Sequence, residues 1–207
     1  VYRWNRPCYG ITDGKPHLRI ENRVLPSGPT ALDEVANTAL FIGLVLGMAK
    51  EYGDISKVME FDNARVNFID AARQGMGSSM RWVKGKIYQA QELVLKELLP
   101  LAREGLQEFA VGSTDIERYL GVIEERCVAG TTGASWLLES VLSLQKQLPP
   151  DPLYRTLTQA MLQRQLEGLP VHQWSLANIK ETQRWTQGSK LVEDLMSTDF
   201  RTVHPEE

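Results

Sequence analysis

Four ionisable residues at every second position could carry out phosphate and metal chemistry: His17, Arg19, Glu21 and Arg23. Side chains on a β-strand alternate between its two faces. The four would therefore share one face within ~14 Å, at a rise of about 3.3–3.4 Å per residue. A carboxylate binds a hard cation such as Mg²⁺, and an arginine fork binds phosphate oxygens. The alternative is a solvated strand face with charges of alternating sign.

The strand that carries these charges is the second of two β-type runs. Residues 1–9 and 17–25 flank a stretch that contains the turn dipeptide Asp13-Gly14, which predicts a hairpin. The residues between the charges are mostly apolar: Leu18, Ile20, Asn22 and Val24. This second, apolar face predicts that the strand lies inside a sheet. A sheet position favours a functional site over a solvated face.

Several motifs occur in a shared order along residues 1–174. They are Arg3-Trp4-Asn5-Arg6-Pro7, the run from His17 to Arg23, Pro26-Ser27-Gly28-Pro29-Thr30, Asn67-Phe68, Ala71-Ala72-Arg73-Gln74-Gly75, and Gly130-Thr131 with Gly133-Ala134. Together they resemble glutamate–cysteine ligase family 2 and its carboxylate–amine ligase relatives. Their shared order carries more weight than any single motif. One departure is Thr132, an extra residue inside a loop that resembles the family's Gly-Thr-Gly-Ala.

The resemblance implies roles for four charged residues. In that family a sheet strand carries Glu-x-Arg, whose glutamate binds the magnesium that accompanies ATP and whose arginine contacts the transferred phosphate. Glu21 and Arg23 match this pair. Arg19, on the same face, is expected to bind phosphate or a substrate carboxylate. Arg73 either reaches the nucleotide or stabilises the end of its helix near Gly75, and the sequence leaves both roles open.

The reaction implied by the resemblance has two steps and uses ATP and Mg²⁺. ATP phosphorylates a carboxylate, expected to be the γ-carboxylate of glutamate. An amine, expected to be that of cysteine, then attacks the acyl phosphate, as in glutathione biosynthesis. Two alternatives remain. One is a ligase of the same superfold with a different acid or amine. The other is a non-enzymatic helical regulatory or interaction module coupled to nucleotide sensing.

The expected fold class is α+β and predominantly α. The end of an antiparallel sheet, glutamine-synthetase-like by resemblance, should be followed by a helical bundle. Helices are predicted over 30–52, 55–74, 86–109, 113–128, 134–148 and 152–168. Thr30 should cap the first helix, which is apolar nearly all round and is expected to be buried and central. Pro100 predicts a kink or break in the third.

Three regions are expected along the chain. Residues 1–174 would form the C-terminal part of a ligase catalytic domain, and residues 175–188 a linker that lies on the body. Residues 189–207 resemble the truncated start of a CBS domain, through Val192-Glu193-Asp194-Leu195-Met196-Ser197. A start without methionine and an end within a strand suggest a longer protein. Its N-terminal half would hold the remaining metal ligands, so the 207-residue chain alone is expected to be inactive.

The amino-acid composition of the chain restricts the classes of binding partner and the cellular location that are expected. The formal net charge is −3, without a basic excess, so the expected partners are small-molecule substrates and not nucleic acid. The longest apolar run, residues 39–49, is shorter than the ~20 residues of a membrane span, so no membrane association is expected. Two isolated cysteines indicate reduced thiols in a cytoplasmic protein. A homo-oligomer remains possible.

Overall fold

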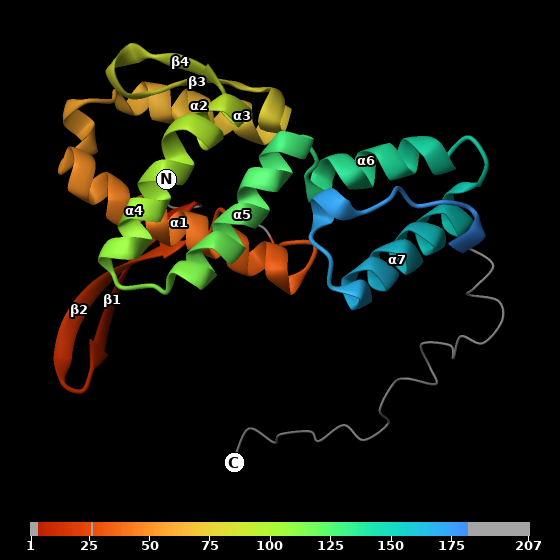
Figure 1. The fold of residues 1–207 in the computed structure, drawn as a ribbon, viewed down its shortest axis with the longest axis horizontal. Helices are drawn as coiled ribbons and strands as arrows, with labels where there is room; N and C mark the ends of the chain where they lie inside the picture. The colour runs from red at the N-terminus through yellow and green to blue at the C-terminus, as the bar shows by residue number, and fades with distance from the viewer. Residues whose placement is uncertain (1–3, 26, 182–207) are drawn as a thin grey trace.

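The computed structural model describes residues 4–25 and 27–181. The described chain is α+β and predominantly helical, as predicted, and begins with a small antiparallel sheet (Figure 1). Its strands and helices are β1 (Asn5–Thr12), β2 (Lys15–Asn22), α1 (Ala31–Tyr52), α2 (Phe61–Gln74), β3 (Ser79–Arg81), β4 (Ile87–Gln89), α3 (Ala90–Leu93), α4 (Leu99–Glu108), α5 (Ser113–Ala129), α6 (Gly133–Leu144) and α7 (Pro150–Glu167). Short 3₁₀ turns cover Ile55–Lys57, Gly75–Gly77, Val83–Gly85 and Val171–Gln173.

The first two strands form the predicted hairpin. They pair around Asp13 and Gly14, whose φ values of 51° and 74° suit the two-residue turn of a hairpin. Both strands extend farther toward the turn than predicted, and β2 ends earlier, at Asn22. Within the described residues β1 and β2 pair only with each other, so β2 lies in a two-stranded sheet, and further strands beside it stay a prediction. The side chains of Leu18 and Ile20 are 80% and 70% exposed.

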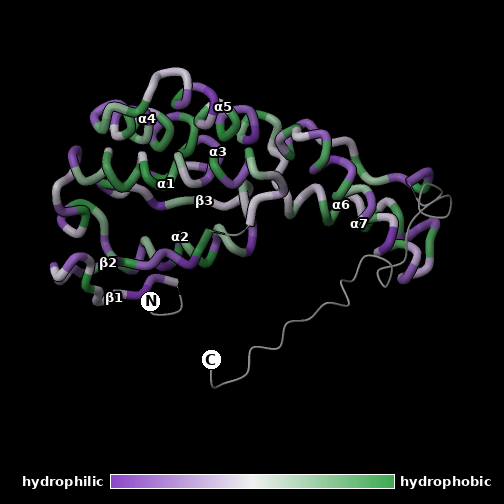
Figure 2. Tube along the Cα trace, turned by 90° about the horizontal axis from the view of Figure 1, so that it is seen from below, coloured by the Kyte–Doolittle hydropathy of each residue, from purple (hydrophilic) through white to green (hydrophobic). Residues whose placement is uncertain are grey.

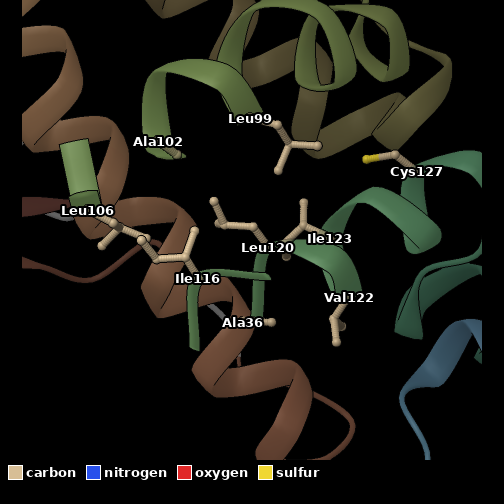
Figure 3. Packing of buried hydrophobic residues seen from close by; sticks show 9 residues of the cluster. All are labelled: Ala36, Leu99, Ala102, Leu106, Ile116, Leu120, Val122, Ile123 and Cys127. Carbon is tan, nitrogen blue, oxygen red and sulfur yellow. The ribbon is translucent and has the colours of Figure 1, made fainter. Parts of the chain in front are cut away.

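Helix α1 is the central element of the first core, and its expected cap is confirmed. The Thr30 side chain accepts a hydrogen bond from the Asp33 N–H, and the helix ends at Gly53. Helices α4 and α5 pack on one side of α1 (Figure 2). Their shared core, shown in Figure 3, contains Ala36, Leu99, Ala102, Leu106, Ile116, Leu120, Val122, Ile123 and Cys127. Full burial of α1 was wrong, since Ile42 and Val45 on it are exposed.

Glycines allow α1 and α4 to approach closely. A Cβ added to Gly105 would lie 2.2 Å from the Gly43 carbonyl oxygen and 2.6 Å from the Gly47 nitrogen. A Cβ on Gly47 would lie 2.1 Å from the Leu101 carbonyl oxygen. These neighbours are backbone atoms, which cannot rotate away. The contact between the two helices therefore requires small residues at these positions.

Gly105→Ala is expected to destabilise the chain by about 1–3 kcal/mol, because overpacking forces the backbones of α1 and α4 apart. Gly121→Ala is the matched control, since a Cβ there meets no atom within 4 Å. Because Gly121 is inside α5, that change should be neutral or stabilise by about 0.5–1 kcal/mol. Urea unfolding followed by circular dichroism measures both. Equal stability of the two variants would contradict the close packing.

Helix α1 also bears on the expected absence of a membrane segment. Over Ala31–Tyr52 it is long and apolar enough to cross a membrane, although core helices of soluble proteins meet the same criterion. The estimate from the uninterrupted apolar run was therefore too strict. In the structure α1 packs along α4 and α5. Because only 22% of its apolar window is buried, the absence of a membrane span stays a prediction.

The region predicted as one helix over 86–109 has several parts. Strand β4 begins it, α3 follows, and a π-helical segment, Val94–Leu98, precedes α4. A kink or break at Pro100 stays a prediction: the π segment ends two residues before the proline, and Leu98 and Leu99 keep right-handed helical dihedrals. The hairpin of β3 and β4 was missed. Its signal was the Lys84-Gly85 pair, which adopts φ values of 58° and 74° at the turn.

A second core joins α6, α7 and the segment after them. It contains Trp136, Leu144, Leu153, Leu157, Ala160, Val171, Trp174 and Ala177. The Trp136 and Trp174 rings meet edge to face at 5.1 Å. Figure 2 shows these two helices beside the larger group of elements. Residues 170–181 thus pack on the body, whereas the rest of the expected linker and the expected CBS segment lie outside the described residues.

Candidate functional site

The predicted pair Glu21 and Arg23 lies at the open end of the β1–β2 hairpin. Glu21 Oε1 accepts a hydrogen bond from Arg23 Nε at 3.0 Å, and Oε2 accepts one from Arg23 Nη2 at 3.2 Å. Arg6, the register partner of Glu21 on β1, places Nη2 2.7 Å from Oε2. The Cys8 thiol is 3.6 Å from the same oxygen. One carboxylate is therefore held between two guanidinium groups.

These contacts favour the ionised form of Glu21. The hydrogen bond from Arg23 is the largest cause that lowers its pKa below the ordinary value, and the charges of Arg23 and Arg6 act in the same direction. The pKa is lowered although partial burial opposes it. At neutral pH the group is a carboxylate, which is the form that can bind a metal ion or an arginine.

Arg19 and His17 lie on the same face of the hairpin as Glu21, Arg23 and Arg6, but nearer the turn. These five residues form the charged face of the hairpin. Arg19 is the register partner of Cys8, and His17 is that of Gly10. A Cβ on Gly10 would lie 2.8 Å from His17 Nε2 and 3.2 Å from Arg19 Nη2, so the glycine leaves room for both side chains. The predicted shared face is thus present. Among the described residues, Arg19 forms no ion pair.

Two contacts at the open end of the hairpin fix the position of the charged face. The Arg23 N–H donates to the Trp4 carbonyl oxygen at 2.8 Å, and the Trp4 ring meets the Phe68 ring of α2 at 4.6 Å. The neighbouring Asn67 accepts from the Arg81 N–H at 2.8 Å and donates to the Arg81 carbonyl oxygen at 2.6 Å. Asn67 and Phe68 therefore join α2 to β3 on one side and to the hairpin on the other.

The charged face could offer a magnesium ion one carboxylate, that of Glu21. No group of three or more His, Cys, Asp or Glu residues able to hold a metal occurs within residues 4–25 and 27–181. Glu21 fits the role of a single oxygen ligand, because its carboxylate is ionised and about 40% exposed. Three protein ligands are not present together in this part of the chain. The described residues can therefore supply one part of a magnesium site.

A comparison with protein-family models decides the identity of the chain. Residues 4–164 match the model of glutamate-cysteine ligase family 2. The chain belongs to this family. No match was found in the comparison with curated proteins or in that with solved structures. Membership of the family implies a ligase that joins a carboxylate to an amine.

Arg73, the fourth predicted site residue, lies apart from the Glu21 contacts. It occupies the last turn of α2, is exposed, and has no ion pair to another described residue. The helix ends one residue later, at Gln74, and the Gly75 N–H donates to the Ala71 carbonyl oxygen. A cation in the last turn of a helix interacts favourably with the helix dipole. The geometry therefore supports the helix-end role, and nucleotide binding by Arg73 stays a prediction.

The family-like glycine loop has a clear local geometry, including its additional residue. Thr132 caps α6 by a reciprocal pair of hydrogen bonds with Ser135, and Gly130 takes a left-handed conformation at the end of α5. Gly133 packs against Pro29, where an added Cβ would lie 2.7 Å from the proline ring. The extra threonine is thus a helix cap. The loop contacts the segment that follows the hairpin.

Sequence reasoning missed Arg6 as a site residue. In the sequence it stands only within the motif Arg3-Trp4-Asn5-Arg6-Pro7, because its pairing with Glu21 depends on the register of β1 against β2. The available signal was the two-residue turn at Asp13 and Gly14. Counting outward from that turn by equal steps on both strands places Arg6 opposite Glu21.

Proposed function

We propose that the chain is part of an ATP-dependent ligase that joins the γ-carboxylate of glutamate to the amine of cysteine through an acyl phosphate. Family membership supports the ligase class. The observation that supports phosphate chemistry is the Glu21 carboxylate held between Arg6 and Arg23 on one face of the hairpin. Phosphoryl transfer depends mainly on positioning and on neutralising charge, which these residue types supply.

Three residues of the charged face have proposed roles. Glu21 would hold Mg²⁺, whose positive charge would neutralise phosphate oxygens when it is bound. Arg23 would contact the transferred phosphate, and Arg19 would bind phosphate or the substrate carboxylate. Both arginines present donors that strengthen as negative charge develops. These groups form one side of a site and leave the other side to further residues of the enzyme.

The proposed substrates and setting follow from the same assignment. Amino acids and ATP are small molecules, and the formal net charge of −3 argues against nucleic acid as the partner. We propose a cytoplasmic enzyme, because ATP-dependent glutathione biosynthesis and reduced cysteines belong together there.

Trapping the intermediate tests this function. With ATP, Mg²⁺ and glutamate, the enzyme that contains this chain should release ADP and convert hydroxylamine to γ-glutamyl hydroxamate, because hydroxylamine attacks an acyl phosphate. Replacing cysteine with other amines, and glutamate with other acids, then defines specificity. ADP release that needs a different acid would keep the ligase class and reject glutamate. Absence of nucleotide turnover with every acid would reject the proposal.

A further inference from the structure

The charged face of the hairpin carries three arginines, whereas the family-like Glu-x-Arg pair accounts for one of them, Arg23. Arg6, Arg19 and Arg23 are three guanidinium groups, and Glu21 is the carboxylate among them. Two of the three cations are already used by that carboxylate, at 2.7 Å for Arg6 and 3.0 Å for Arg23. An anion that binds this face must therefore compete with Glu21 for the same donors.

The side chain of Arg6 is held at this position by its own strand. The following residue is Pro7, which restricts Arg6 to extended backbone. The register places Arg6 directly opposite Glu21. Arg23 lies one residue beyond the end of β2, and its backbone N–H is tied to Trp4. The side chains of Arg6 and Arg23 are 37% and 36% exposed, although Arg6 Nε is buried, so a soluble anion can reach the exposed part of each side chain.

We propose that Arg6, Arg19 and Arg23 form an anion-binding face in which Glu21 is an internal anion that incoming phosphate displaces. This inference rests on the proposed function and adds Arg6 to the phosphate-binding residues. Once phosphate has taken the arginine donors, the Glu21 carboxylate is released and becomes available to a metal ion. The same four residues would thereby couple the arrival of phosphate to the exposure of a metal ligand.

The test is calorimetric titration of the 207-residue chain with tripolyphosphate, without divalent metal ions. Glu21→Gln should bind more tightly than the unmodified chain, by about threefold to tenfold, because exposed ion pairs of modest strength no longer occupy Arg6 and Arg23. Arg6→Gln should bind more weakly by a similar factor, and Arg6→Lys should recover part of the loss. Arg65→Gln is the matched control, because this exposed arginine pairs with Asp62 on α2, outside the charged face.

The possible results distinguish a failure of the anion-binding inference from a failure of the proposed ligase function. Unchanged or weaker binding by Glu21→Gln would overturn the internal-anion role. Unchanged binding by both Arg6 variants would remove Arg6 from the face. In the complete enzyme, the magnesium role predicts that Glu21→Gln abolishes turnover. Normal turnover combined with tighter tripolyphosphate binding would reject the magnesium role and leave the anion-binding face intact.

Discussion

Glu21→Gln is expected to lower turnover of the enzyme at least about a hundredfold, the scale of losing an interaction made in the transition state. The substitution keeps the shape of the side chain and removes the charge proposed to hold magnesium. The fold should be little affected, because Glu21 is partly exposed and its ion pairs lie at the surface. Steady-state kinetics measure the turnover, and thermal unfolding measures the stability.

Glu139→Gln is the control for that experiment, since Glu139 is an exposed glutamate of α6 in the other group of helices. It should retain full activity. A Glu21→Gln enzyme that keeps more than about a third of its turnover would remove the metal role, since a directly bound ligand contributes far more. Loss of the folded state would contradict the expectation that Glu21 contributes little to stability.

The largest expected effect on stability comes from Asp33→Ala. Asp33 is fully buried in the first turn of α1, where it pairs with Arg126 of α5 at 2.7 Å. Its other oxygen accepts hydrogen bonds from the Thr30 hydroxyl at 2.9 Å and from the Val171 N–H at 3.1 Å. Removal should cost about 3–5 kcal/mol, because a nearly buried guanidinium loses its counter-charge.

Glu34→Ala is the control, because Glu34 is the adjacent acidic residue and its side chain is exposed. It should change stability by less than about 0.5 kcal/mol. Urea unfolding of the chain measures both variants. A loss below about 1 kcal/mol for Asp33→Ala would show that the contacts linking α1, α5 and the segment at Val171 contribute little.

Local chemistry explains why many elements could be predicted. The turn at Asp13-Gly14, the Thr30 cap and the helix ends at Gly53, Gly75 and Gly168 each depend on residues a few positions apart. Their conformations follow from side-chain capping and from the freedom of glycine at positive φ. The shared face of Arg19 and Glu21 likewise follows from the period of a strand.

Distant segments decide what covers the apolar face of a strand or helix, and the sequence alone did not predict it. Alternation along β2 gave an apolar face, but nothing in the sequence says which partner covers it, and Leu18 and Ile20 are exposed in the described chain. The apolar character of α1 predicted burial on all sides, whereas α4 and α5 cover one side. Periodicity records which residues share a face and carries no information about what packs on that face.

By itself the sequence determined the hairpin, the order of the helices and the charged pair of Glu21 and Arg23. These depend on strand and helix periods and on local turns. Tertiary structure alone decided the pairing of Arg6 with Glu21 across β1 and β2, and of Asp33 with Arg126 over 93 residues of sequence. Such pairs form because packing brings charged groups together, and their separation along the chain has no period that a sequence pattern could reveal.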